Sequence, residues 1–382
     1  MAEAVRALTL AELRKRKSVK WRHFPSDVLP LPVAEMDFPT APKIKAALTD
    51  MVERSDTGYL GPFPELFDAF ANFSAKRWGW QVDVKQMRMA TDVGVGIVEI
   101  MRTLIKPGEK VMLNSPVYEN IWRWISEVHA TTIDTPLSED NLSYKLDLAA
   151  IEKEYQNGVK VHILCHPHNP VGAIFSKDQL SDLADLAKKY QVVILSDEIH
   201  APLTYDAKTF TPFLNVSQNA KEVGIAITSA SKSFNLAGLK CAFIITDSIK
   251  LQERINLMPP AVTWRASLFG AVASTAAYAE SVDWLDGVLI TLDQNRKLVE
   301  KLIASKAPAI KYRIPDFGYL AWLDLSALAL GEDPAAVILE KGKLAVNGGV
   351  LYGPKHKSFV RLNFGTSPEI ITEAFDRLAN CL

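Results

Sequence analysis

Short apolar runs alternate with longer amphipathic segments over much of the chain, beginning near residue 87. Near-continuous apolar runs are typical of strands buried on both faces of a sheet, whereas apolar residues spaced by three or four positions predict helices. The runs predict strands at residues 111–114, 161–165, 192–195, 224–227 and 241–245. Because helices are expected between these strands, the pattern indicates an α/β fold with a mostly parallel sheet flanked by helices.

The first 80 residues follow a different pattern. The spacing from Thr9 to Glu12 is that of a capping box and predicts a short helix. Residues 29–38 are predicted to belong to an extended arm, because a continuous helix or central strand is excluded by prolines at positions 25, 30, 32, 39 and 42. Amphipathic patterns predict helices over residues 42–54 and 64–78.

The pattern changes again after about residue 280. A long helix is expected over residues 284–305, followed by strand-like runs at 320–325 and 358–364 and by a final helix at 367–378. These elements predict a smaller α+β domain. The expected organisation is an N-terminal arm packing with the small domain (1–41), a large domain (42–280) and a small C-terminal domain (281–382).

Composition narrows the class of protein. A chain of 382 residues with 48% hydrophobic and 23% charged residues is ordinary for a globular protein of two domains. The net charge of −1 argues against nucleic acid or an anionic membrane as the main partner, and no apolar run is long enough to span a bilayer. The 3 cysteines are too widely spaced to suggest a disulfide framework or a metal site. Since the N-terminus also lacks a signal-peptide pattern, we expect a soluble cytoplasmic protein.

The segment that follows the predicted strand at 224–227 carries the first candidate chemistry. Ser229, Ser231 and Lys232 come directly after the strand, which would place an amine and two hydroxyls at one edge of the sheet. A partly desolvated amine can lose its proton near neutral pH and attack a carbonyl carbon. Taken alone, Lys232 could equally be an exposed lysine at the start of a helix, since lysines are mostly exposed.

Other polar residues fall in loops that leave neighbouring predicted strands, where open α/β sheets bind ligands. These residues are Tyr118, Asn169 and Asp197, and a turn containing Gly94 opens a helix whose N–H groups suit a phosphate. Each also has an ordinary structural explanation, as a core aromatic, a turn residue, a helix cap or a tight turn. Together they supply an amine, a carboxylate, an aromatic ring, an amide and a phosphate cradle. That set is what pyridoxal 5'-phosphate requires.

The chain resembles fold type I pyridoxal-phosphate enzymes of the class I/II aminotransferase superfamily, and within it the cystathionine β-lyase-like (C–S lyase) branch. The resemblance covers essentially the whole length. It rests on motifs in the same order as in the family: Pro-Val-Ala-Glu-Met-Asp-Phe at 32–38, Pro-Val-Tyr at 116–118, Pro-His-Asn-Pro-Val-Gly at 167–172, Ser-Asp-Glu-Ile-His at 196–200, Ser-Lys-Ser-Phe-Asn-Leu-Ala-Gly at 231–238 and Val-Arg-Leu-Asn-Phe at 360–364.

This resemblance implies a role for each matched residue. Lys232 would bind the cofactor covalently as an imine and, once displaced by substrate, remove the Cα proton. Asp197 would pair with the pyridinium nitrogen, Asn169 would donate to the phenolate oxygen, and Tyr118 would stack on the ring. Arg361 would bind the substrate carboxylate through both arms of its guanidinium group. The remaining cofactor-binding residues implied are Val93, Gly94, Val95, Ser229, Ser231 and Lys240 around the phosphate, and His200 near the phenolate oxygen.

Tyr59 matches the tyrosine that this family sends to the cofactor phosphate of its neighbour, so the resemblance implies a homodimer with composite active sites. The sequence departs from the branch at Pro32, where tryptophan is usual, and at Glu35, where aspartate is usual. His166 and Lys240 stand where asparagine and arginine are common. The first two departures bear on the pocket for the substrate side chain, and the other two leave the cofactor site plausible.

Two chemistries and one non-enzyme function remain open on these residues. The leading hypothesis is α,β-elimination of a sulfur amino acid such as cystathionine to a thiol, pyruvate and ammonia, as in methionine biosynthesis. The alternative is transamination between an amino acid and a 2-keto acid, which uses the same residues. A catalytically idle binding or regulatory module is the third, and the complete Lys232–Asp197–Asn169 set argues against it.

Overall fold

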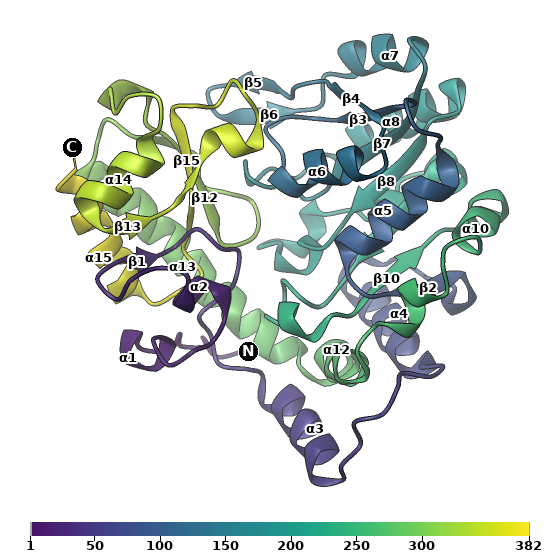
Figure 1. The fold of residues 1–382 in the computed structure, drawn as a ribbon, viewed down its shortest axis with the longest axis horizontal. Coiled ribbons are helices and arrows are strands. Elements are labelled where there is room, and N and C mark those ends of the chain that lie inside the picture. The colour runs from purple at the N-terminus through teal and green to yellow at the C-terminus, as the bar shows by residue number, and fades with distance from the viewer. Residues whose placement is uncertain (1, 382) are drawn as a thin grey trace.

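The computed structural model describes residues 2–381 and is built around a seven-stranded sheet (Figure 1). The strand order is β2-β10-β9-β8-β7-β3-β4, and β10 alone runs antiparallel to its neighbours within this sheet. The strands are β2 (Met87–Ala90), β3 (Lys110–Leu113), β4 (Thr131–Asp134), β7 (Val159–Cys165), β8 (Val193–Asp197), β9 (Gly224–Thr228) and β10 (Ala242–Ile245). The predicted α/β fold with a mostly parallel sheet is confirmed.

Helices cover both faces of this sheet, because successive strand residues point to opposite sides. Val111 and Leu113 belong to the core cluster formed with one group of helices, whereas Met112 belongs to the core on the other face. The first group comprises α5 (Val93–Leu104), α6 (Glu119–Glu127), α10 (Ile249–Ile255) and α11 (Ala261–Trp264). The second comprises α3 (Pro42–Glu53), α4 (Pro64–Trp78), α7 (Leu148–Gln156), α8 (Lys177–Tyr190), α9 (Gln218–Val223) and α12 (Leu268–Glu280).

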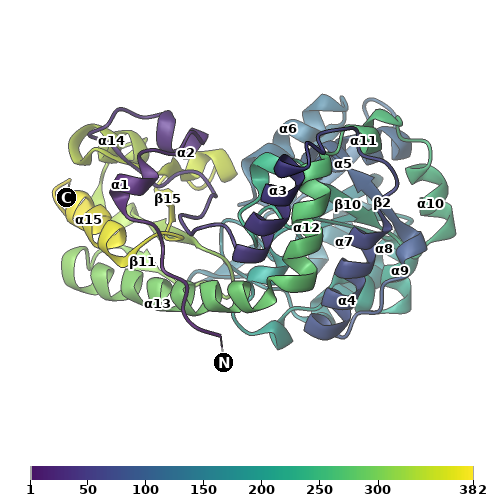
Figure 2. The same ribbon diagram turned by 90° about the horizontal axis from the view of Figure 1, so that it is seen from below.

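A smaller lobe contains an antiparallel four-stranded sheet in the order β11-β12-β15-β14. Its strands are β11 (Lys311–Tyr312), β12 (Leu320–Asp324), β14 (Asn347–Gly348) and β15 (Phe359–Asn363). Its helices are α13 (Val282–Lys306), α14 (Pro334–Gly342) and α15 (Pro368–Ala379). Figure 2 shows the two lobes side by side, with the long helix α13 lying along the smaller one. The expected α+β character of this part is confirmed, while the domain boundaries at 41 and 280 stay a prediction.

The N-terminal arm lies against the smaller lobe (Figure 1). Its first helix, α1 (Leu10–Leu13), begins with the predicted Thr9–Glu12 capping box. A short helix that the pattern did not predict, α2 (Val19–Arg22), follows it. The arm then forms β1 (Leu29–Pro30), which pairs in parallel with β13 (Leu344–Ala345) of the smaller lobe.

Several elements escaped the sequence pattern for physical reasons. The hairpin of β5 (Ser138–Asp140) and β6 (Ser143–Lys145) is short and largely exposed, so it has no apolar run. Helix α12 is buried around most of its circumference and therefore shows no one-sided stripe. Among the described residues, none of the helices is both long and apolar enough to cross a membrane.

Candidate active site

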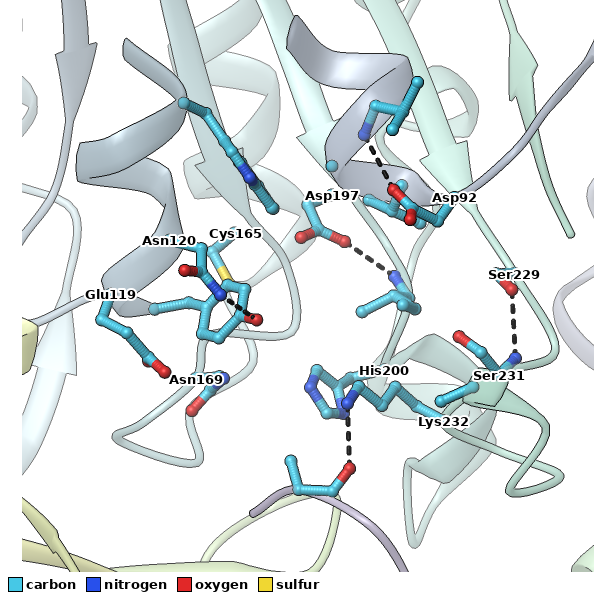
Figure 3. A pocket seen from close by; sticks show the side chains of 18 of the residues that line it. Asp92, Glu119, Asn120, Cys165, Asn169, Asp197, His200, Ser229, Ser231 and Lys232 are labelled. Carbon is cyan, nitrogen blue, oxygen red and sulfur yellow. Dashed lines mark hydrogen bonds between the residues drawn. The ribbon is translucent and has the colours of Figure 1, made fainter. Parts of the chain in front are cut away.

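The carboxyl ends of β7, β8 and β9 meet at a cavity of about 670 Å³, which a side chain of β15 also reaches (Figure 3). Cavities of this size are typical of sites for small molecules and cofactors. The structure brings together nearly all of the residues that the sequence predicted: Val93, Gly94, Val95, Tyr118, Asn169, Asp197, His200, Ser229, Ser231, Lys232, Lys240 and Arg361. Tyr59 is the exception, since it lies in the loop between α3 and α4 and is 99% exposed.

Lys232 is half-buried at the centre of the cavity. Its Nζ donates a hydrogen bond of 2.9 Å to the main-chain oxygen of Ala34 in the arm. Burial, together with the positive charge of Arg361, lowers the pKa of the Lys232 amine to about 8. Lys232 can therefore exchange a proton near neutral pH, as a nucleophilic amine or a base must.

Asp197 ends strand β8 and is only 4% exposed. One carboxylate oxygen accepts a 3.1 Å hydrogen bond from the Ile199 N–H. Burial raises the pKa of this carboxyl to about 6. The hydrogen bond from Ile199 and the positive charge of Lys232 lower the pKa, but by less than burial raises it. A desolvated carboxylate with few donors favours a cationic partner, which suits a protonated ring nitrogen.

Arg361 reaches the cavity from β15 and is 2% exposed. Its Nη1 donates to Asn169 Oδ1 at 3.1 Å and its Nη2 to the Pro32 oxygen at 3.0 Å. The buried Nε has no hydrogen-bond partner among the described residues. The guanidinium group of Arg361 can therefore bind a carboxylate, which would replace the neutral oxygens of Asn169 and Pro32 as hydrogen-bond acceptors. Tyr118 lies on the same side, and burial raises the pKa of its hydroxyl.

The start of α5 forms the opposite end of the cavity. Asp92 caps this helix by accepting from the Val95 N–H at 2.8 Å, and it pairs with Lys240 Nζ at 3.0 Å. Val93 and Gly94 occupy the first two helical positions, whose N–H groups have no acceptor within the helix. These N–H groups and the nearby lysine suit a phosphate.

A glycine is required at position 94 because a Cβ atom there would lie 2.8 Å from the ring of Trp124. Ser229 is already engaged, since its Oγ donates to the Cys241 oxygen at 2.6 Å and accepts from the Ser231 N–H. The phosphate-binding roles of Ser229, Ser231 and Val95 stay predictions.

The two histidines of the motifs have different surroundings. His200 is buried, its Nδ1 has no partner in the described part of the chain, and its burial beside Lys232 holds its pKa well below the usual value. His166 stacks between Phe175 and Phe210, and its Nε2 lies 3.2 Å from the Thr211 oxygen. His166 is therefore a packing residue.

Of the two departures in the arm, Glu35 does not line the cavity, since it accepts from Ser18 Oγ at 2.7 Å and lies 3.7 Å from Arg16, although its charge still acts on Lys232. Other lining residues belong to no recognised motif. Glu119 and Asn120 directly follow Tyr118 as the first two residues of α6, so following the chain past the Pro-Val-Tyr motif would have found them. Asn347 lies on the two-residue strand β14, for which the sequence offers no signal.

The residues present fit the cofactor that the motifs imply. The unpartnered Nδ1 of His200 and Nε of Arg361 are buried donors or acceptors without a protein partner. The cavity also offers a helix start without internal acceptors, a desolvated carboxylate and an amine with a pKa of about 8. An anionic aromatic aldehyde such as pyridoxal 5'-phosphate would satisfy these groups.

Comparisons with known proteins agree with this fit. The family model "Aminotransferase class I and II" matches residues 26–378. The cystathionine β-lyase of Corynebacterium glutamicum is 34% identical over 98% of this chain and 99% of its own, and cystathionine β-lyase PatB of Bacillus subtilis is 30% identical over 96% and 97%. The crystal structure of cystalysin from Treponema denticola, which contains a pyridoxal 5'-phosphate cofactor, superposes with a TM-score of 0.93 at 26% identity, covering 100% and 98% of the two chains.

Proposed function

Since the chain belongs to the class I and II aminotransferase family, we propose that it is a pyridoxal-phosphate-dependent carbon–sulfur lyase. It would act on cystathionine or a related sulfur amino acid and release a thiol, pyruvate and ammonia. The observation that carries the choice of reaction is the 34% identity, over nearly the full length of both chains, to a cystathionine β-lyase. The fold is that of fold type I pyridoxal-phosphate enzymes, as the superposition with cystalysin indicates.

Pyridoxal 5'-phosphate, when bound, supplies an electrophilic aldehyde carbon and a pyridinium ring that accepts electron density, chemistry that no side chain provides. Asp197 would hold the ring nitrogen protonated, and Asn169 would donate to the phenolate oxygen. Tyr118 would cover one face of the ring. The N–H groups of Val93 and Gly94 and the Lys240 ammonium would bind the phosphate.

The remaining steps use groups of this chain. Arg361 would bind the substrate α-carboxylate and fix its orientation, as its unpartnered Nε allows. Lys232 would take the proton from Cα, which its lowered pKa permits. The electron pair freed at Cα expels the thiolate from Cβ, and the thiolate takes up a proton. Addition of one water to the remaining three-carbon fragment gives pyruvate and ammonia, so the overall reaction balances.

Transamination is the second candidate, and one finding favours it. An aspartate aminotransferase of Pyrococcus horikoshii is 25% identical over 93% of this chain. The same lysine, aspartate and arginine would serve that reaction.

One assay separates the two reactions. Purified holoenzyme is given cystathionine without any 2-keto acid, and pyruvate and free thiol are measured. We expect both products in equal amounts, and neither in a Lys232→Ala control. Conversion of an added 2-keto acid to the corresponding amino acid, without pyruvate or free thiol from cystathionine, would instead identify an aminotransferase. If the protein showed no imine absorption band that disappears in Lys232→Ala, it would be a catalytically idle binding or regulatory module.

We also infer a homodimer located in the cytoplasm, with a role in methionine biosynthesis through release of homocysteine. In support of a dimer, Tyr59 is 99% exposed and two further large side chains, Leu257 and Trp264, are 67% and 74% exposed. Sedimentation equilibrium would test the dimer. Tyr59→Phe should weaken cofactor binding if this hydroxyl reaches the phosphate in the other subunit.

A further inference from the structure

Carboxylates line the cavity in larger number than the cofactor requires: Asp92, Glu99, Glu119, Glu127 and Asp197. Most of them are accounted for. Asp92 pairs with Lys240 at 3.0 Å and Glu99 with Arg102 at 3.4 Å. Asp197 faces the place of the ring nitrogen, and Glu127 is exposed to solvent at the rim. Glu119 is therefore the one partly buried carboxylate of this set without a hydrogen-bond or ion-pair partner among the described residues.

Glu119 is the first residue of α6 and is half-buried. Its Oε2 is shielded from solvent and accepts no hydrogen bond within residues 2–381. A carboxylate oxygen that loses its water without gaining a donor costs free energy, so such a group calls for a ligand. Figure 3 shows Glu119 beside Asn120, the next residue of α6, on the side of the cavity where Asn169 lies.

The surroundings of Glu119 place it beside the substrate rather than the phosphate. Burial and, after it, the Glu119 charge raise the pKa of Tyr118, and Glu119 also contributes to the raised pKa of Tyr352. Tyr352 in turn packs under the guanidinium group of Arg361, 5.0 Å from its ring centroid. No ion pair within 4.0 Å joins Glu119 to Arg361 in the described chain, so its negative charge remains open to a mobile cation.

We propose that Glu119 binds an ammonium group carried by the leaving-group side of the substrate, so that the enzyme selects thioethers whose released thiol bears an amine. The assignment rests on the proposed lyase function. In the proposed lyase, Arg361 would bind the substrate α-carboxylate, and the α-amine would face Lys232 at the place of the cofactor aldehyde. A cation that reaches Glu119 must therefore stand beyond the sulfur, where aliphatic amines are charged at neutral pH. Cystathionine has such a group, and simple S-alkyl cysteines lack it.

A pair of synthetic substrates of equal size tests the proposal. S-(3-aminopropyl)-L-cysteine and S-butyl-L-cysteine have the same number of heavy atoms and differ by one charged nitrogen. We expect wild-type holoenzyme to prefer the aminopropyl compound in kcat/KM by about tenfold or more, mainly through KM. Glu119→Gln keeps the shape of the side chain and should abolish the preference while leaving the butyl compound within about twofold of wild type. Glu127→Gln, at the exposed rim, should retain the preference.

Two outcomes overturn the assignment. An equal loss for both substrates in Glu119→Gln would mean a role in folding or in the chemical step, and a preference that persists would mean that another group binds the ammonium.

Failure of the lyase function is recognised separately, as absence of pyruvate from either compound with wild-type enzyme. In that case the role of Glu119 is tested by calorimetry. The binding affinities of the α-methyl derivatives of both compounds, which have no Cα proton to lose, are compared. A roughly tenfold tighter binding of the amine, lost in Glu119→Gln, supports the assignment, and equal binding contradicts it.

Discussion

The cavity has two walls that are held in different ways. The sheet wall, formed by Asn169, Asp197 and residues 229–232, stands on the ends of adjacent parallel strands. Its internal hydrogen bonds are local, such as those from Ile199 to Asp197 and from Ser231 to Ser229. Two long-range hydrogen bonds, from Arg361 to Asn169 and from Lys232 to Ala34, join this wall to the other one. The arm wall, where Val33, Ala34 and Arg361 line the cavity, is held in place by hydrogen bonds between distant parts of the chain, which join residues 29–38 to Arg361 and Asn363.

In the arm wall, side chains bind the main chain of the arm. Asn363 Nδ2 donates to the oxygens of Val33 and Glu35, each at 2.7 Å, across more than 300 residues of sequence. Tyr319 Oη donates to the Ala34 oxygen at 3.1 Å. The sheet wall therefore presents reactive groups, whereas the arm wall mainly fixes where the substrate can lie. Changes in the first should impair the chemical step, and changes in the second should impair stability and substrate binding.

The largest effect is expected for Lys232→Ala in the sheet wall. Loss of the amine removes the base and the covalent link to the cofactor, so turnover should fall by about 10³-fold or more. The free energy of unfolding of the cofactor-free protein should not fall, because the removed ammonium is desolvated. Steady-state kinetics and urea denaturation measure the two quantities. A variant that keeps a tenth of the activity would contradict the role of Lys232.

The next largest effect is expected for Asp37→Asn, which lies in the arm. Asp37 is fully buried, pairs with the equally buried Lys20 at 2.7 Å and accepts from Trp21 Nε1 at 2.9 Å. Neutralising it leaves a buried ammonium without its counter-charge and should lower the free energy of unfolding by about 3–5 kcal/mol. Glu280→Gln, which breaks the exposed pair with Lys43, is the control and should have little effect in the same denaturation experiment.

Asn363→Ala should have an intermediate effect on both the free energy of unfolding and substrate binding. It removes the Asn363 donor from the carbonyls of Val33 and Glu35, of which the second keeps its hydrogen bond from Lys20 Nζ at 3.1 Å. The loss should lower the free energy of unfolding by about 2 kcal/mol. Because the arm also contacts Arg361, KM should rise several-fold while kcat changes less. A drop in kcat at constant KM would show that the arm wall takes part in the chemical step.

The stability of the cofactor-free protein should depend on pH through the sheet wall. Lys232 has its pKa lowered from 10.5 to about 8, so between these values the unfolded state holds a proton that the folded state has released. Stability should therefore rise with pH across this window, by about 3 kcal/mol, and Lys232→Met should lack that rise. Asp197, with its pKa raised from 3.8 to about 6, should make stability fall as pH rises between those values. Denaturation curves from pH 4 to pH 10 for wild type, Lys232→Met and Asp197→Asn would test both signs.

The smallest effect is expected for Glu35→Gln. Its carboxylate interacts with Ser18 and Arg16 on the arm and does not line the cavity. Since a partly exposed pair contributes little, stability should change by less than about 1 kcal/mol and KM should stay within twofold. A larger rise in KM would show that Glu35 does contribute to substrate binding.

The sequence was informative about the sheet wall and much less so about the arm wall. Lys232 and Asp197 could be found because each follows an apolar strand directly, and the ends of parallel strands gather at one edge. The contacts of the arm are made by main-chain carbonyls, such as that of Ala34. Every residue has such a carbonyl, so the residue types in the arm do not reveal these contacts. Glu119 was missed because the sequence contains many carboxylates. Only the structure shows that this one is partly buried and has no hydrogen-bond donor for its Oε2 among the described residues. The role of Tyr59 at the site of a second subunit stays a prediction.

The hydrogen bond from Arg361 to the Pro32 carbonyl joins residues that are 329 positions apart. During synthesis the arm emerges from the ribosome more than 300 residues before its partners on β15. The sheet wall can fold while the chain grows, because its strands are neighbours in sequence order. The arm must remain unpaired until β15 has been synthesised. A nascent chain stalled before residue 361 would therefore hold the amine and carboxylate near each other and yet have no place for a substrate.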